Sequence, residues 1–149
     1  TVPGDTSMSE LTPTIRAFLA RQRVGHLATV DRSGDPHVVP VCYAVGERTL
    51  YIPIDEKPKR TDRPLKRMRN ILETGRAAVV VDRYDEDWTR LGWVLLRGTA
   101  ELVHPGSHEQ HEAIALLRQR YPQYATMALE TRPVIALRIE RVTAWGFLD

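Results

Sequence analysis

The order of hydrophobic and polar residues along the chain predicts a mainly β (α+β) fold. Six runs have the two-residue alternation or the continuous apolar character of strands. They cover residues 24–30, 36–45, 49–54, 76–84, 92–103 and 133–147. Short turns join the first three runs, so we expect them to form an antiparallel meander. Because strands and helices do not alternate, the pattern favours an antiparallel six-stranded barrel or sandwich over a parallel sheet.

Three further segments have the apolar spacing of helices. They cover residues 13–23, 64–73 and 108–121. Thr12 and Ser107 are residue types that cap the beginning of a helix, and Gly75 is the type that ends one. Residues 1–9 have no periodicity. We therefore expect a flexible N-terminal tail, followed by a single domain over residues 10–149.

Some of the predicted strands are apolar on both faces. Val39 and Val41 alternate with Val38 and Cys42 in one run, and the run over 92–103 has the same character. A barrel interior covers only one face of an antiparallel strand, and the predicted helices are too few to cover the other face of three such strands. We therefore expect a homodimer built on sheet faces, with a larger monomeric core as the alternative.

Composition narrows the class of protein. The chain has 149 residues, of which 42% are hydrophobic and 27% charged, a balance that allows a core and excludes a fibrous or disordered protein. Cys42 is the single cysteine, which excludes an internal disulfide. The sequence contains no run long enough to cross a membrane and no signal-peptide pattern, so a soluble cytoplasmic protein without membrane partners is expected.

Positive charge is concentrated in one segment. The formal net charge is only +2, but residues 57–69 hold seven lysines and arginines against one acid, Asp62, a local charge of +6. Such a focused field attracts anions. A solvated basic loop is the alternative reading. Nucleic-acid binding is not expected, because the segment lacks interleaved aromatic residues and a DNA-reading motif.

The sequence contains none of the common motifs for catalysis by side chains or by a bound metal. His108 and His111 lie three residues apart on a predicted helix, but the HExxH pattern is absent and no metal site is expected. No GxSxG elbow or phosphate-binding glycine loop occurs, and Cys42 lies within an apolar strand. An enzyme with this sequence would depend on a bound cofactor for its chemistry.

Pro40 indicates where such a cofactor could bind. A proline within a strand cannot donate to the sheet, so Pro40 belongs to an edge strand or a bulge. The strand over 49–54 leads directly into the basic segment and into the start of the helix near Pro64, and helix N-termini favour anions. A flat group could lie against the strands while its anionic tail reaches the cations. This arrangement suggests a flavin-like cofactor that carries a phosphate.

Several motifs resemble those of the pyridoxamine-phosphate-oxidase-like split β-barrels. The runs GHLATVDRSGDPHVVPVCYAV, LYIPIDEKPKR, LKRMRNILETGRAAVVVDRYDEDW and WVLLRGTAELV follow one another in the family's order. The combination of G-x-P-H-V-V-P-V with K-x-x-R-N-[IL] is similar to the family's probable F420-dependent branch. The resemblance spans about residues 10–147 and implies a homodimeric split barrel with two cofactor sites at the subunit interface.

The resemblance also implies which residues contact the cofactor. The ring would rest on the second and third strands, at Val39, Pro40, Val41, Ile52 and Pro53. The phosphate would be held by Lys57, Lys59, Arg60, Lys66, Arg67 and Asn70. An aromatic residue of the other subunit would close the site, with Trp88 and Trp93 as candidates. No catalytic residue is assigned, because a deazaflavin carries the hydride itself.

Three functions therefore remain open. The first is an oxidoreductase that uses coenzyme F420 to transfer a hydride to or from a small molecule, and seven cations suit the long polyanionic tail of F420. The second is an FMN-binding oxidase-like protein with the same fold. The third is a carrier that binds F420 or a flavin without turnover. The sequence does not identify the small-molecule substrate.

Overall fold

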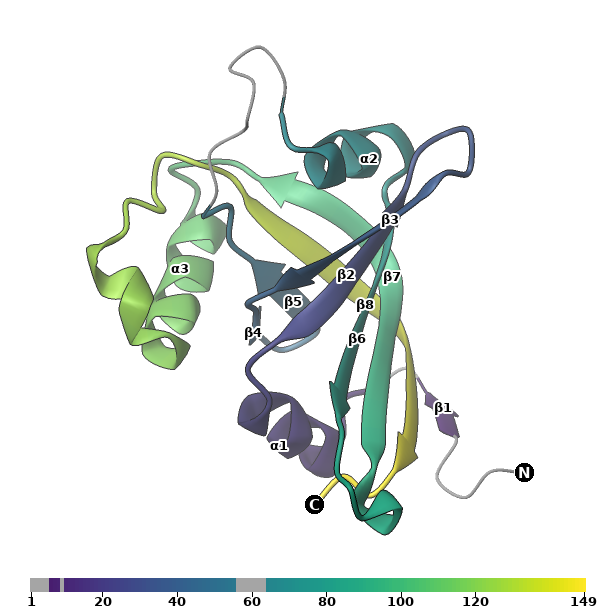
Figure 1. Ribbon diagram of the computed structural model, residues 1–149. Coiled ribbons are helices and arrows are strands. Elements are labelled where there is room, and N and C mark those ends of the chain that lie inside the picture. Colours follow the sequence, from purple (N-terminus) through teal and green to yellow (C-terminus); the bar gives the residue numbers. More distant parts are fainter. Residues whose placement is uncertain (1–5, 9, 56–63) are drawn as a thin grey trace.

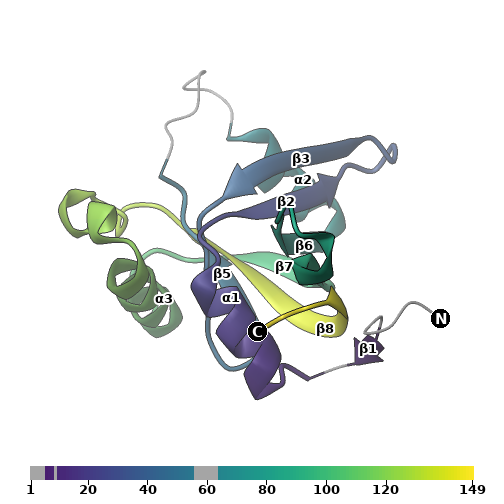
Figure 2. The same ribbon diagram turned by 60° about the horizontal axis from the view of Figure 1, so that its bottom comes forward.

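The computed structural model describes residues 6–8, 10–55 and 64–149, and it confirms a mainly β fold (Figures 1 and 2). An eight-stranded antiparallel sheet curls around a core and is accompanied by three α-helices and two short 3-10 helices in the described residues. In chain order the elements are β1 (Thr6–Met8), α1 (Pro13–Arg21), β2 (Gly25–Val30), β3 (Pro36–Val41), β4 (Ala44–Val45), β5 (Thr49–Ile52), α2 (Lys66–Thr74), β6 (Arg76–Arg83), η1 (Trp88–Arg90), β7 (Gly92–Val103), α3 (His108–Arg120), η2 (Pro122–Thr126) and β8 (Val134–Gly146).

The helix ends confirm the expected capping residues. The Thr12 side chain accepts a hydrogen bond from the Ile15 amide at 3.2 Å, and the Ser107 side chain accepts one from the Gln110 amide at 3.2 Å. Gly75 ends α2 with a φ of 66°, a left-handed conformation that favours glycine. In the described part of the chain, no helix is long and apolar enough to span a membrane.

The prediction of a three-stranded meander is wrong for its middle strand. The hydrogen-bonded order is β3-β2-β6-β7-β8-β5-β4, so the second predicted run splits into β3 and β4, at opposite ends of the path. The split falls at Tyr43, whose amide donates to the Tyr121 hydroxyl at 3.2 Å and whose carbonyl accepts from Arg120 Nε at 2.8 Å. Side chains at the end of α3 thus satisfy the backbone groups that a continuous strand would have paired in the sheet.

The strand count also differs from the six expected. Splitting residues 36–45 adds one strand, and Thr6–Met8 adds another as β1, which pairs with β8 from Thr6↔Ala144 to Met8↔Val142. The segment expected to be a flexible tail therefore contains a short strand. By contrast, the position of Pro40 is confirmed, because β3 lies at the edge of the path and pairs only with β2 among the described strands.

Two apolar clusters form the core. The larger one fills the curled sheet and includes Leu27, Val79 and Leu96 of the strands, together with Phe18 of α1 and Ile71 of α2. Figures 1 and 2 show α1 and α2 at opposite ends of the sheet and α3 outside it. The second cluster lies under α3 and η2. The two clusters fix the ends of β3 and β5, where the candidate site lies.

Candidate functional site

A pocket of about 220 Å³ lies where β3 and β5 end. Its lining residues are Val24, Pro40, Val41, Cys42, Ile52, Pro53, Asp55 and Arg67. Five of these are among the cofactor contacts expected from the sequence, namely Pro40, Val41, Ile52, Pro53 and Arg67. Although β3 and β5 lie far apart in the hydrogen-bonded order, the curl of the sheet brings their ends to one cavity.

The walls of the pocket are largely apolar. Val41 and Ile52 are 8% and 1% exposed, so their side chains are anchored in the barrel core. Pro40 and Pro53 have no N–H group, so neither adds a backbone donor to the wall. Val39, also expected in the site, is half-buried and packs against the core instead of lining the pocket. The cavity therefore offers an apolar wall to a flat molecule.

Arg67 brings a positive charge to this wall. It lies in the first turn of α2 and is only 6% exposed. A guanidinium group keeps its charge when buried, and its planar set of donors matches a phosphate or carboxylate group. The structure thus places Arg67 in the same pocket lining as Pro40 and Pro53.

Lys66, the neighbour of Arg67, has a different contact. Its Nζ lies 3.2 Å from Asp31 Oδ2, in the turn between β2 and β3. Hydrogen bonds from the Ser33 side chain and the Asp35 amide, with a smaller contribution from Lys66, hold the pKa of Asp31 well below its usual value. Asp31 is therefore a permanent anionic partner, and Lys66 joins α2 to the β2–β3 turn.

Asn70 is part of the packing of α2. Its side chain is fully buried, and its Nδ2 donates to Thr29 Oγ1 at 3.1 Å. It does not line the pocket. The remaining expected phosphate contacts, Lys57, Lys59 and Arg60, lie outside the described residues.

Asp55 is a feature of the site that the sequence analysis missed. Tyr124 of η2 donates from its hydroxyl to Asp55 Oδ2 at 2.6 Å. Burial, followed by this hydrogen bond to Asp55, raises the pKa of Tyr124 well above its usual value, so its hydroxyl remains a donor. The described lining therefore carries one anion and one cation. Two residues 69 positions apart give no local signal of such contact.

Trp88 and Trp93 do not line the pocket within one chain. Trp88 is 70% exposed on η1, and Trp93 stacks on Trp145 with ring centres 6.5 Å apart at the beginning of β7. Figure 1 shows that β7 runs from this end to the opposite end beside α2, where the Ala100 amide donates to the Gly75 carbonyl. Trp93 and Ala100 are seven residue steps apart along β7, about 23 Å. The structure therefore places neither tryptophan in the pocket lining of its own chain.

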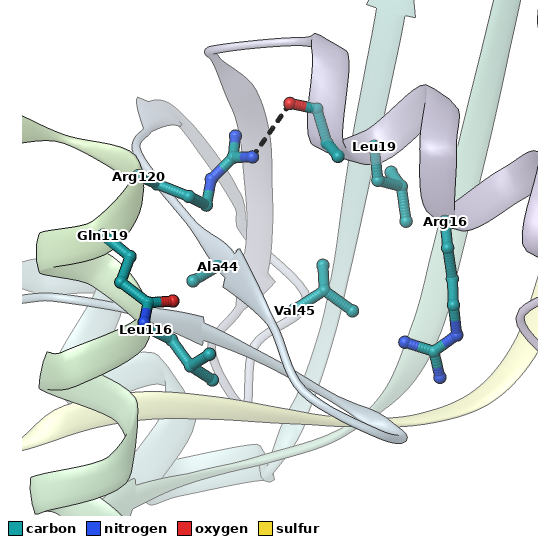
Figure 3. Close-up of a pocket in the computed structure, with 8 residues that line it drawn as sticks. Arg16, Leu19, Ala44, Val45, Leu116, Gln119 and Arg120 are labelled. Carbon is teal, nitrogen blue, oxygen red and sulfur yellow. Dashed lines mark hydrogen bonds between the residues drawn. The ribbon is translucent and has the colours of Figure 1, made fainter.

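A second cavity, of about 230 Å³, lies between α1, β4 and α3 (Figure 3). Arg16 Nη1 donates to the Gly46 carbonyl at 2.9 Å, and Arg120 donates to the carbonyls of Ala20, Tyr43 and Gln22 at 3.0, 2.8 and 2.7 Å. The dashed line in Figure 3 marks the contact with Ala20. Both guanidinium groups therefore connect structural elements, which makes this cavity a weaker candidate.

No group of three or more histidine, cysteine or acidic side chains that could hold a metal ion occurs among the described residues. His108 pairs with Glu112 at 2.7 Å on the exposed face of α3. The described part of the site thus consists of the apolar wall, Arg67 and Asp55.

Comparison with known proteins identifies relatives of this chain. The chain is 30% identical over 132 residues to a 5a,11a-dehydrotetracycline/5a,11a-dehydrooxytetracycline reductase of Streptomyces rimosus, covering 87% of this chain and 78% of the relative. A FAD-binding protein from Mesorhizobium loti superposes with a TM-score of 0.65 at 25% identity, over 93% of this chain and 95% of that one.

A heme-binding protein from Mycobacterium smegmatis has the same fold, with a TM-score of 0.69 at 23% identity. The match covers 90% of this chain but 53% of the other, so the chain spans about half the length of that protein. The family model described as pyridoxamine 5'-phosphate oxidase matches residues 11–146. This chain, with its split barrel and its pocket at the ends of β3 and β5, belongs to the pyridoxamine 5'-phosphate oxidase family.

Proposed function

We propose that this protein is an F420-dependent oxidoreductase that acts in the cytoplasm as a homodimer and reduces an unsaturated small molecule. The observation that carries the proposal is the pocket in which Arg67 stands beside the walls formed by Pro40 and Pro53. The names of the family and of the Streptomyces rimosus relative both describe oxidoreductases.

The chemistry of the pocket fits a deazaflavin or flavin. Two prolines and two core-anchored aliphatic side chains form an apolar wall, and the buried guanidinium of Arg67 adds a positive charge to it. Asp55 offsets the charge of Arg67 within the lining. The preference for the longer polyanion of F420 therefore rests on the basic segment 57–69 as a whole.

The protein's part in the reaction would be binding, orientation and exclusion of water. When bound, the reduced deazaflavin supplies the hydride. Val41 and Ile52, fixed by the core, would hold the ring in one position, and Arg67 would hold its anionic side. Tyr124 keeps the Asp55 carboxylate in place at the pocket wall.

The homodimer is part of the same proposal. The outer faces of β2, β6 and β7 present Ala28, Val80 and Leu95, and Val38 of β3 is 63% exposed. Among the described residues, neither core cluster contains a helix that packs on this outer face. A second copy packed there would bury an apolar surface and could bring Trp88 or Trp93 to the pocket of the first copy.

Two alternatives share the pocket. FMN has one phosphate, which Arg67 alone could hold, and the Mesorhizobium loti structure shows that a protein of this fold binds a flavin cofactor. A carrier without turnover would need the same binding groups. The Mycobacterium smegmatis relative adds heme as a ligand to test.

Titration of the purified protein with F420, FMN and hemin, followed by fluorescence or absorbance, separates these possibilities. The proposal expects micromolar or tighter binding of F420 and weaker binding of FMN and hemin. Binding of FMN with none of F420 would reverse the order. Reduced F420 should then be oxidised when an enone such as a dehydrotetracycline is added. Tight binding without oxidation by a broad panel of acceptors would favour the carrier.

A further inference from the structure

Asp55 gives the pocket at the ends of β3 and β5 a charge for which the proposed function names no ligand contact. It lies three residues after the end of β5, and it lines the pocket together with Arg67. Among the described residues of the lining, Asp55 is the single carboxylate. A carboxylate repels anions and accepts hydrogen bonds. The lining therefore contains a group suited to a different part of the ligand from the one that Arg67 would hold.

The backbone that carries Asp55 is fixed by the residues before it. The Ile54 side chain is buried in the core of the curled sheet. The Ile54 carbonyl accepts a hydrogen bond from Arg132 Nη1 at 3.3 Å. Pro53 precedes them, and its ring restricts the backbone further. Asp55 therefore projects its carboxylate from a backbone whose position is set by the core.

Tyr124 then fixes the carboxylate itself. Its hydroxyl donates to Asp55 Oδ2 at 2.6 Å, a length typical of a charge-assisted hydrogen bond. The Tyr124 ring is 3% exposed and belongs to the core cluster under α3 and η2. It meets the Tyr121 ring edge-on, with ring centres 5.5 Å apart. A buried tyrosine thus holds one oxygen of a carboxylate that lines the pocket.

The Asp55 carboxylate has further acceptor sites. Its two oxygens together offer about four sites for donors. Among the described residues, the Tyr124 hydroxyl is the one hydrogen-bond donor to it, and none of their ion pairs includes Asp55. A ligand that fills the pocket displaces water from these sites, and a charged acceptor is costly to leave without a donor. Asp55 therefore favours a ligand that brings a donor to it.

We propose that Asp55 is a specificity-determining residue of the pocket, whose carboxylate, positioned by Tyr124, accepts a hydrogen bond from an N–H or O–H group of the bound ligand. The inference rests on the proposed function, because it names a further contact of the ligand in that pocket. Its support is the restrained carboxylate, its remaining acceptor sites and its place in the same lining as Arg67.

Two molecules of the proposed reaction could bring the donor. The deazaflavin and flavin rings both carry an imide N–H between two carbonyl groups. A hydroxyl group on the small-molecule substrate is the second source. The chemistry is the same in both cases, because an analogue without the donor would leave the carboxylate unpaired and would be rejected.

The test compares two chromophores by fluorescence titration of the full chain. One is the deazaflavin chromophore of F420 without its phosphate and glutamates, and the other is the same molecule methylated at the imide nitrogen, which removes the donor. We expect the wild type to bind the parent about tenfold more tightly than the methyl derivative. Asp55→Asn, which removes the charge, and Asp55→Ala, which also makes room for the methyl group, should lose most of this preference.

Two control variants make matched changes elsewhere. Asp35→Asn removes an exposed carboxylate in the β2–β3 turn. Tyr51→Phe removes a hydroxyl that donates to another carboxylate, that of Glu109, at 2.7 Å, and Tyr51 does not line the pocket. Both variants should keep the wild-type preference. Tyr124→Phe should lose part of it, because the Asp55 carboxylate is no longer held, and thermal unfolding shows whether each variant retains its fold.

A second arm identifies the source of the donor. A hydroxy-substituted cyclohexenone and its methyl ether are titrated into the F420-loaded protein, and binding is followed by the fluorescence of the cofactor. A preference for the hydroxy compound that is lost in Asp55→Asn would assign the donor to the substrate. Loss of the chromophore preference would assign it to the ring. If FMN binds in place of F420, FMN and its imide-methylated derivative make the same comparison.

The outcomes separate this inference from the proposed function. Binding of the cofactor with no preference in either comparison, or with a preference that Asp55→Asn and Asp55→Ala leave unchanged, would overturn the role of Asp55 and leave the proposed function standing. An equal loss of preference in Asp35→Asn would also overturn it. Absence of binding by both F420 and FMN would remove the proposed function and this inference with it.

Discussion

Arg67 and Lys66 are adjacent in the sequence, but their side chains have different surroundings. Arg67 lines the pocket, whereas Lys66 pairs with Asp31 outside it. The resemblance to the split-barrel family implied that both residues contact the phosphate. Charge pattern alone does not reveal the direction in which a side chain leaves the first turn of a helix, and this separation required the fold.

Substitution of each residue by alanine tests the difference. Arg67→Ala should weaken cofactor binding at least tenfold, about 1.5–3 kcal/mol, because a charge-assisted contact with the anion is lost. Lys66→Ala should leave affinity nearly unchanged and lower the free energy of unfolding by about 1 kcal/mol or less, as for other surface ion pairs. Fluorescence titration and urea denaturation measure the two effects. Equal losses of affinity would contradict the assignment.

Glu109 gives the protein a pH-dependent contact between α3 and the sheet. Its carboxylate accepts from Arg138 at 2.9 Å and from the Tyr51 hydroxyl at 2.7 Å. The Arg138 contact, with a smaller contribution from Tyr51, lowers the pKa of Glu109 from 4.5 to about 2. Because the folded state binds the proton less readily than the unfolded state, this stabilisation is complete above pH 4.5 and disappears as the pH falls toward 2.

Glu109→Gln should therefore unfold at a lower temperature than the wild type at pH 7, and the difference should shrink as the pH falls between 4.5 and 2. Glu112→Gln, on the exposed face of the same helix, is the control. It should change the unfolding temperature little at any pH in this range. Calorimetry over this pH range measures both. A difference for Glu109→Gln that is constant with pH would show that the carboxylate contributes only by packing.

At the level of elements, local patterns predicted most of the helices and strands. The caps Thr12, Ser107 and Gly75 are read from single residues, and each is confirmed. The break at Tyr43 was missed because the apolar pattern continues through it, while its partners Arg120 and Tyr121 lie more than 70 residues away. The Asp55–Tyr124 contact was missed for the same reason.

The bulge at Gly98 is a second element-level feature with a testable consequence. A Cβ at this position would lie 1.8 Å from the Arg138 carbonyl oxygen, so the two strands can approach only at a glycine. Gly98→Ala should lower the free energy of unfolding by about 2 kcal/mol or more, because backbone must move. Gly46→Ala is the matched control, since its Cβ would lie 3.3 Å from the Tyr51 side chain and 3.6 Å from the Thr49 carbonyl oxygen. Equal denaturation midpoints for the two variants would contradict this reading.

At the scale of the whole molecule, the uncovered outer face is the basis of the proposed dimer. The alternation of apolar residues on both faces predicted it, and the structure places Ala28, Val80 and Leu95 on the outer side of the sheet. The local pattern of a strand carries no signal for the surface of a second copy that would cover these residues.

Leu95→Glu should shift the protein to a monomer and weaken cofactor binding, because a charge would be buried in the interface and each pocket would lose the closing residues of the other copy. Leu72→Glu, at a residue that is 66% exposed on α2, is the control and should leave the oligomeric state unchanged. Analytical ultracentrifugation measures both. A wild-type protein that sediments as a monomer would remove the dimer from the proposal.

A crystal structure of the protein grown with F420 tests the central claim most directly. We predict the deazaflavin ring against Pro40 and Pro53, its anionic side at Arg67, and Trp88 or Trp93 of a second copy at the open side of the pocket. The account is contradicted if the cofactor is bound elsewhere on the protein while the cavity at the ends of β3 and β5 holds only solvent.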